Sequence, residues 1–142
     1  MDQSQLMKEL RMKGYKVTPQ RMAICELVLN SEDHPTAEQV YLSLKKKYPA
    51  MSLATVYQVL HLLTEMGMLQ ELGFSGWNAR YDPNVEPHIN VVCKECGKVV
   101  DYSDQSVTKT IKEMLRGLDF EPKGVRIDVY KICEGCRSRM NG

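Results

Sequence analysis

Apolar residues recur at helical spacing along the first two segments of the chain. In residues 3–13 they lie three and four positions apart, and the pattern ends at Gly14. Residues 19–28 repeat this spacing after Thr18 and Pro19, a typical helix start because threonine caps a helix and proline fits its first turn. The pattern therefore predicts two short amphipathic helices.

Two further helices are predicted before the pattern changes. Thr36 begins one of them, because Gln39 can complete a capping box, and we expect its apolar side to comprise Val40, Leu42 and Leu44. Ser52 caps the other, which ends at Gly67. The core stripe of this fourth helix follows the spacing i, i+3, i+4, i+7 and comprises Val56, Val59, Leu60 and Leu63.

Shorter segments with strand-like alternation follow. Residues 68–74 and 78–82 flank Ser75-Gly76-Trp77 and predict a hairpin. Residues 88–93, 98–102 and 125–132 predict three more strands, with a helix starting at Ser103-Asp104 between the last two. In the last strand we expect two faces, one with Val125, Ile127 and Val129 and the other with Arg126, Asp128 and Tyr130.

The segment 83–87 has two prolines and no periodicity, so we expect it to be a linker. Residues 1–82 combine helices with a hairpin in the order of a winged-helix DNA-binding domain. Residues 88–142 form a small α/β domain, and the fold class is α+β. A three-stranded sheet gains by pairing its edge with a copy of itself, which predicts a symmetric homodimer.

Composition and charge say little about the function, but they bear on where the protein acts. Among 142 residues, 19 basic side chains face 18 acidic ones, and this near-neutral balance indicates no polyanionic partner by itself. The N-terminal segment lacks the apolar core of a secretion signal, and the apolar stretches are short and broken by charge. We therefore expect a cytoplasmic protein without a membrane span.

Four of the five cysteines form two Cys-x-x-Cys pairs, Cys93 with Cys96 and Cys133 with Cys136. Each pair can present two thiolates at a tight turn, and two such turns complete a tetrahedral sulfur shell suited to zinc. Reversible disulfides and an iron centre of rubredoxin type are the alternatives. Cys25 lies in an apolar helical run and is predicted to be a buried packing residue.

The polar face of the fourth helix carries small and hydrogen-bonding side chains. Such a face can enter a major groove and contact base edges, although a solvated surface has the same pattern. We expect the DNA contacts to come from Tyr57, Thr55, Ser52, Ala54 and Gln58, with Arg21 nearby. For Arg21 the alternative is a structural salt bridge, and Lys45, Lys46 and Lys47 are more typical of a solvated helix end than of a phosphate site.

Several motifs together resemble the ferric uptake regulator family. They are Thr18-Pro19-Gln20-Arg21, Asp33-His34-Pro35-Thr36-Ala37, Ala54-Thr55-Val56-Tyr57, Arg80-Tyr81-Asp82 and Cys93-Lys94-Glu95-Cys96-Gly97-Lys98-Val99. The resemblance covers nearly the whole chain. It implies a dimeric, metal-activated transcription regulator, usually a repressor, that binds palindromic operators in double-stranded DNA. It also implies one structural zinc per subunit on the four paired cysteines.

The resemblance further implies a regulatory metal site between the two domains, with ligands His34, Asp82, His88 and Asp101. Two imidazoles with carboxylates suit Fe(II), Mn(II) or Zn(II). Asn90 stands where most relatives have a third histidine and is a further candidate ligand; its amide oxygen can coordinate a hard cation, but we expect it to hold a transition metal less well than an imidazole does.

Aspartate at both carboxylate positions resembles the peroxide-sensing branch, since the iron-sensing branch tends to use glutamate. In that branch bound Fe(II) reacts with peroxide, a ligating histidine is oxidised, and DNA is released. Here the matching histidines are His34 and His88. An iron- or zinc-responsive uptake regulator is the alternative within the family.

Two other function classes fit the sequence less well. The sequence shows no recognisable Ser/His/Asp or Cys/His set and no glycine-rich phosphate loop, so we do not expect an enzyme. A metal-storage module that does not bind DNA is the other alternative, but it would have no need of a winged helix.

Overall fold

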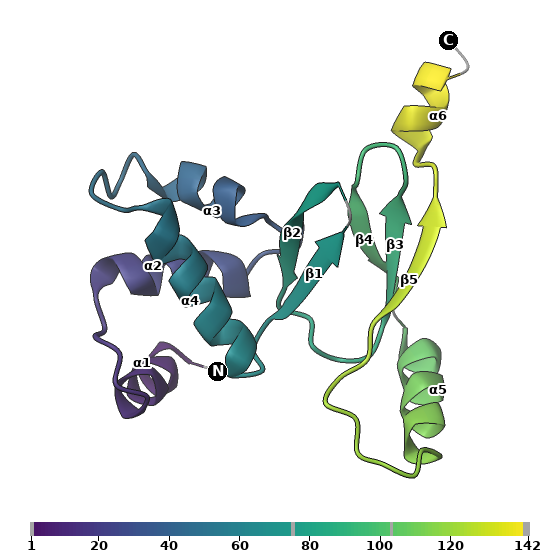
Figure 1. Cartoon of the computed structure of the whole chain (residues 1–142), viewed down its shortest axis with the longest axis horizontal. Helices are drawn as coiled ribbons and strands as arrows, with labels where there is room; N and C mark the ends of the chain where they lie inside the picture. The colour runs from purple at the N-terminus through teal and green to yellow at the C-terminus, as the bar shows by residue number, and fades with distance from the viewer. Residues whose placement is uncertain (1, 75, 103, 141–142) are drawn as a thin grey trace. The chain divides into compact units, whose positions relative to one another are not determined.

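The computed structural model describes residues 2–74, 76–102 and 104–140. It divides into two compact units, Met1–Val85 and Glu86–Gly142, which are described separately (Figure 1). Ser75 and Ser103, which the sequence placed in the hairpin turn and at a helix start, lie outside the described residues. Among the described residues, no helix has the length and apolar character that crossing a bilayer requires.

The first unit begins with four helices, each preceded by a capping side chain. The helices are α1 (Gln3–Met12), α2 (Pro19–Leu29), α3 (Ala37–Leu44) and α4 (Leu53–Glu65). The predicted caps Thr18, Thr36 and Ser52 each accept a hydrogen bond from the backbone N–H three residues later. Gln39 completes the capping box by accepting from the Thr36 N–H at 2.9 Å.

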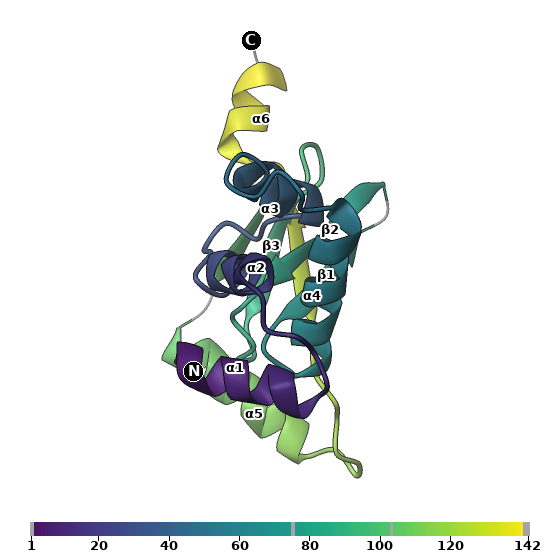
Figure 2. The same ribbon diagram turned by 90° about the vertical axis from the view of Figure 1, so that its left-hand side faces the viewer.

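Helix α4 packs against α2 and α3 and supplies much of the core (Figures 1 and 2). The predicted core stripe Val56, Val59, Leu60 and Leu63 is buried, together with Ile24, Cys25 and Val28 of α2. The prediction for α3 is wrong at Leu42, which is 67% exposed. Residues two apart lie on opposite sides of a helix, so Val40 is buried with Ala37, three positions earlier, and Leu42 faces solvent.

A hairpin of strands β1 (Gln70–Phe74) and β2 (Trp77–Asp82) follows α4. Strand β2 also holds the loop that precedes α3. The Tyr81 N–H donates to the Pro35 carbonyl at 3.0 Å, and the Arg80 guanidinium donates to the His34 carbonyl at 3.0 Å. The hairpin therefore fixes the backbone of the loop that carries His34.

The second unit is built on a three-stranded sheet. Strand β3 (Ile89–Cys93) is central, with β4 (Val99–Tyr102) antiparallel on one side and β5 (Ile127–Lys131) parallel on the other. Helix α5 (Gln105–Arg116), capped by Asp104, lies between β4 and β5 in the chain. A short helix, α6 (Glu134–Met140), carries the last cysteine, and the sequence pattern did not predict it.

Strand β5 lies largely in solvent, and burial along it does not follow the predicted alternation of its side chains. Ile127 and Asp128 are half-buried, whereas Val129 and Tyr130 are both exposed. Strand β5 is an outer strand of the sheet, and neither of its two faces is fully buried.

Candidate metal centres and nucleic-acid interface

The four paired cysteines converge at one end of the sheet in the second unit. Cys93 ends β3, and Cys133 and Cys136 lie at the start of α6. Their sulfur atoms, with that of Cys96, all lie within 4.8 Å of one another. The Cys93–Cys136 and Cys96–Cys133 sulfur separations are both 3.8 Å. This matches the edge of a tetrahedron with zinc–sulfur bonds of about 2.3 Å, so the cluster fits a zinc ion.

Backbone N–H groups favour thiolates in this cluster. Hydrogen bonds from the N–H groups of Cys133, Cys96 and Glu95 lower the pKa of Cys93 to about 6. The N–H of Cys136 likewise lowers the pKa of Cys133. The thiol of Cys136 bonds to the Cys133 sulfur, which raises the pKa of Cys136 to about 12. Zinc binding at this cluster would therefore displace the proton of the Cys136 thiol.

Cys25 has a different environment, as the sequence predicted. Its side chain is fully buried within the core of the first unit, and this desolvation raises the pKa of the thiol to about 11. An uncharged, buried thiol is a packing residue.

His34 and Asp82 form a buried pair in the first unit. The Nε2 atom of His34 lies 3.2 Å from Oδ2 of Asp82, and each residue is 3% exposed. His34 has a φ of +52°, a conformation that non-glycine residues seldom adopt. The hydrogen bonds from β2 to the His34 and Pro35 carbonyls hold this strained backbone. The strained conformation costs stability, and it places the imidazole next to Asp82 at the end of β2.

His88 and Asp101 form the corresponding pair in the second unit. The Nε2 atom of His88 lies 3.1 Å from Oδ1 of Asp101 and 3.1 Å from Oδ1 of Asn90. Its Nδ1 atom lies 2.7 Å from the carbonyl oxygen of Glu86, which can only accept, so Nδ1 carries the hydrogen. This arrangement leaves Nε2 directed at oxygen atoms, as in histidines that bind metals and are oriented by a backbone carbonyl.

The predicted DNA-contacting side chains lie on the outer face of α4 and at its start. Ser52, Ala54, Tyr57 and Gln58 are exposed, whereas Thr55 is half-buried with its hydroxyl 2.9 Å from that of Ser52. Arg21 is half-buried and donates to the Lys16 carbonyl at 2.7 Å. The structure therefore gives Arg21 a backbone partner in place of the salt bridge considered from sequence.

Tyr57 is held by an acidic residue that the sequence did not single out. Its hydroxyl donates to Oε1 of Glu38 on α3 at 2.6 Å, and this bond raises the pKa of Tyr57. Tyr57 as a residue remains 42% exposed. The carboxylate therefore orients a partly exposed aromatic ring on the outer face of α4.

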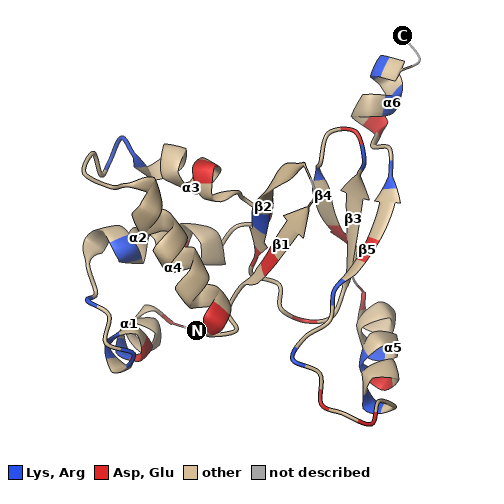
Figure 3. Cartoon of the chain, viewed as in Figure 1, with Lys and Arg blue, Asp and Glu red and all other residues tan. Residues whose placement is uncertain are grey.

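Three lysines follow α3 in the loop that leads to α4 (Figure 3). Lys45, Lys46 and Lys47 are exposed, and the ammonium groups of Lys45 and Lys47 lie 5.5 and 5.8 Å from the rings of Tyr41 and Tyr48. These cation–π contacts and the helix end account for the run without a ligand.

The family to which the chain belongs follows from comparison with known proteins. A profile of the ferric uptake regulator family matches residues 12–130. The chain belongs to the ferric uptake regulator family. Over 132 residues it is 33% identical to the peroxide-responsive repressor PerR of Staphylococcus epidermidis, covering 93% of this chain and 88% of that protein.

Two solved structures share the fold of this family member. The Campylobacter jejuni peroxide stress regulator is 31% identical with a TM-score of 0.70, covering 96% of this chain and 100% of the other. The Pseudomonas aeruginosa ferric uptake regulator with manganese is 31% identical with a TM-score of 0.71, covering 89% and 96%. Family membership confirms the recognition from sequence and supports a regulator rather than an enzyme.

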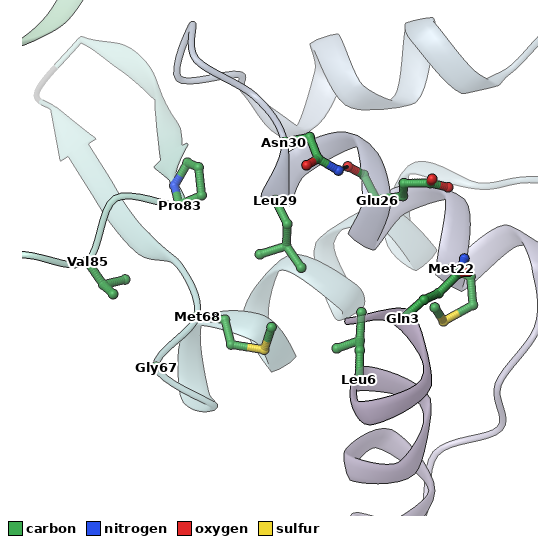
Figure 4. Close-up of a pocket in the computed structure, with 10 residues that line it drawn as sticks. All are labelled: Gln3, Leu6, Met22, Glu26, Leu29, Asn30, Gly67, Met68, Pro83 and Val85. Carbon is green, nitrogen blue, oxygen red and sulfur yellow. Dashed lines mark hydrogen bonds between the residues drawn. The ribbon is translucent and has the colours of Figure 1, made fainter. Parts of the chain in front are cut away.

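A hollow in the first unit of this family member lies apart from all the predicted site residues (Figure 4). It measures about 590 Å³ and is lined by residues of α1 and α2, of the turn after α4 and of the segment after β2. Its polar groups partly satisfy one another, since the Asn30 amide donates to the Glu26 carbonyl at 2.7 Å. Nothing in its lining points to a ligand.

Three residues near the predicted sites were missed in the sequence. The sequence marks Glu38 as an acidic residue in the first turn of a helix, but nothing in it indicates that Glu38 bonds to Tyr57. Asp128 accepts from Asn90 and is held by Arg126, and the alternation of β5 gave no signal that these two residues differ from solvated strand positions.

Proposed function

We propose that this chain is a metal-dependent, DNA-binding transcription repressor whose regulatory site binds Fe(II) or Mn(II) and senses peroxide when it holds Fe(II). The observation that carries the proposal is the pair of histidine–aspartate contacts, buried His34 with buried Asp82 in one unit and buried His88 with half-buried Asp101 in the other. Buried charged groups are costly unless they are paired or bind a metal, and two such pairs in a small chain point to a shared task.

The regulatory metal is proposed to take ligands from His34, Asp82, His88 and Asp101. Imidazole nitrogens with carboxylate oxygens suit Fe(II), Mn(II) and Zn(II), so the donor set fits. Because two ligands belong to each unit, occupancy biases the orientation of the winged helix relative to the dimerisation unit. When bound, Fe(II) supplies the electrons that reduce hydrogen peroxide beside the oxidisable imidazoles of His34 and His88.

The four-cysteine cluster is proposed to hold one structural zinc per subunit. The closed sulfur shell leaves no open position for a reactant, which is typical of a structural site. Zinc would tie the end of β3 to α6 and so stabilise the second unit.

The outer face of α4 is proposed to read a palindromic operator as part of a homodimer. The exposed Tyr57 and Gln58 supply an aromatic ring and an amide that can reach base edges. The exposed Val129 and Tyr130 on the outer strand β5 support dimerisation through this edge of the sheet.

An iron- or zinc-responsive uptake regulator is the second candidate. Aspartate at positions 82 and 101 favours the peroxide-sensing branch, and the S. epidermidis and C. jejuni relatives carry peroxide in their names.

A gel-shift experiment tests the core of the proposal. Genomic fragments selected by the manganese-loaded protein should contain a palindrome, and the protein should bind that palindrome with Mn(II) and lose it on chelation of the second metal. Binding that ignores Mn(II) would contradict metal dependence. Failure to select any DNA would favour the metal-storage alternative.

A further inference from the structure

Asn90 occupies the centre of a polar row on the sheet of the second unit. It is 1% exposed and lies on the middle strand β3. In register it faces Asp101 on β4 and Asp128 on β5. Side chains at paired positions lie on the same face of a sheet, and His88, two residues before Asn90, lies on that face as well. Three polar side chains, those of Asp101, Asp128 and His88, therefore surround the Asn90 amide.

Asp128 determines which way the Asn90 amide points. Its Oδ1 atom accepts from Nδ2 of Asn90 at 3.2 Å. Arg126 in turn holds Asp128, with Nη2 2.9 Å from Oδ2 and Nε 3.1 and 3.2 Å from the two carboxylate oxygens. Because a carboxylate accepts and does not donate, the NH₂ end of the amide must face β5. The Oδ1 end of Asn90 consequently faces His88.

The oxygen of Asn90 and an oxygen of Asp101 both lie close to Nε2 of His88, and all three atoms can donate electron pairs to a metal. His88 Nδ1 carries its hydrogen toward the Glu86 carbonyl, and Nε2 lies 3.1 Å from the Asn90 oxygen and 3.1 Å from an Asp101 oxygen. Adjacent ligands at right angles on a metal with bonds of about 2.1 Å are separated by about 3 Å. Nε2 of His88 therefore lies at the separation of neighbouring ligands of one six-coordinate cation from both the Asn90 oxygen and the Asp101 oxygen.

We propose that Asn90 is a ligand of the regulatory metal through Oδ1, that Asp128 and Arg126 are positioning residues that aim it, and that this oxygen shifts the site toward Mn(II). The inference rests on the regulatory site of the proposed function. An amide oxygen is a harder donor than an imidazole nitrogen. Replacing nitrogen by oxygen favours Mn(II) relative to Fe(II) and Zn(II), which gain more from imidazole.

Metal titration of the full-length, zinc-loaded protein tests this assignment. Affinities for Mn(II) and, without oxygen, for Fe(II) are measured by competition with a chelating dye. Asn90→His should raise the affinity ratio of Fe(II) over Mn(II) roughly tenfold, since it exchanges a hard donor for a softer one. Asn78→His, an exposed asparagine-to-histidine change on β2, is the matched control and should leave the ratio unchanged. An unchanged ratio in Asn90→His would overturn the assignment.

The positioning role has its own variant and spectroscopic signature. In Asp128→Asn the side chain keeps its size but can also donate, so the Asn90 amide is free to turn and Mn(II) affinity should fall about 10-fold or more. Pulsed electron paramagnetic resonance of bound Mn(II) should detect one more coupled imidazole nitrogen in Asn90→His than in the wild type. An equal number of imidazoles in both proteins contradicts ligation at position 90.

The two proposals fail in different ways. If the wild-type protein binds no second metal, or if its operator binding ignores metal, the proposed function fails. If wild-type binding depends on metal but neither position 90 nor position 128 changes affinity, ratio or spectrum, only the ligand assignment fails. Zinc content and circular dichroism establish that each variant is folded before these comparisons.

Discussion

The imidazole of His34 and the carboxylate of Asp82 meet at 3.2 Å although one comes from a loop and the other from the end of a strand. In this position His34 has a φ of +52°, which is unfavourable for a residue other than glycine. Hydrogen bonds from the Arg80 side chain and the Tyr81 N–H to the loop carbonyls stabilise it. A conformation that is costly and well supported is typical of a residue placed for function.

Replacement of His34 tests whether this pair binds the regulatory metal. We expect His34→Ala to retain zinc but to lose the Mn(II) or Fe(II) dependence of operator binding, because one imidazole ligand is removed. His61→Ala is the matched control for metal dependence, since His61 is exposed and pairs with Glu65 within α4; it should keep the Mn(II) dependence even if operator affinity itself changes. Gel shifts with graded Mn(II) measure the dependence, and its persistence in His34→Ala would remove His34 from the site.

Tyr57 provides a test of the DNA-binding face. Glu38 already occupies its hydroxyl, so the exposed ring is the part available to a base. Tyr57→Ala should weaken operator binding roughly tenfold or more at fixed salt, as the loss of a base contact is worth about 1–3 kcal/mol. Tyr57→Phe keeps the ring and should lose much less. If Tyr57→Ala and the wild type bind the operator with equal affinity, α4 is not the recognition helix.

The sequence predicted most of the first unit because its signals are local. Thr18, Thr36 and Ser52 cap the helices that the capping rules assigned to them, and the α4 stripe is buried as its spacing indicated. Leu42 was misassigned because alternate residues do not share a helix face. Helix α6 was missed because its seven residues include Gly135 and read as a metal-binding turn.

Sequence motifs predicted the residues of the candidate sites, but not the contacts that depend on the tertiary structure. The four cysteines come together as their spacing indicated, and Cys25 is buried. The contact of Asn90 with Asp128 depends on the parallel register of β3 and β5, which no local pattern determines. The positive φ of His34 likewise depends on tertiary contacts with β2.

The cysteines divide into two chemical classes that substitution can separate. Cys93→Ser should abolish stoichiometric zinc binding and destabilise the second unit, because a closed four-sulfur shell loses a ligand. Cys25→Ser should keep zinc. Atomic emission of purified proteins measures the metal, and one zinc per chain in Cys93→Ser would contradict the assigned shell. A red, iron-containing wild-type protein would favour the rubredoxin-type alternative.

The reactivity of Cys25 should follow its raised pKa. With a pKa of about 11, roughly one thiol in a thousand is ionised at pH 8, and the ionised fraction rises about tenfold per pH unit toward that value. Iodoacetamide at pH 8 should therefore leave Cys25 unmodified in the native, zinc-loaded protein and should modify it after unfolding. Mass spectrometry locates the label, and rapid native labelling of Cys25 would be inconsistent with its burial.

The exposed edge of the sheet should govern self-association. Val129 on β5 is 47% exposed, and Val129→Glu places a charge on the proposed dimer surface. Light scattering after gel filtration should show a shift toward monomer, because burying an unpaired carboxylate is costly. Val85→Glu, at a valine that is 54% exposed in the first unit, should remain dimeric. Unchanged dimers in Val129→Glu would exclude this edge.

The most direct test of the account measures operator binding before and after exposure to hydrogen peroxide. Two samples of the same zinc-loaded protein are compared, one loaded with Fe(II) and one with Mn(II), and both are then digested for mass spectrometry. The account predicts that only the Fe(II) form releases DNA and that it gains oxygen on His34 or His88. Retention of DNA by the Fe(II) form, with both histidines unmodified, would contradict peroxide sensing.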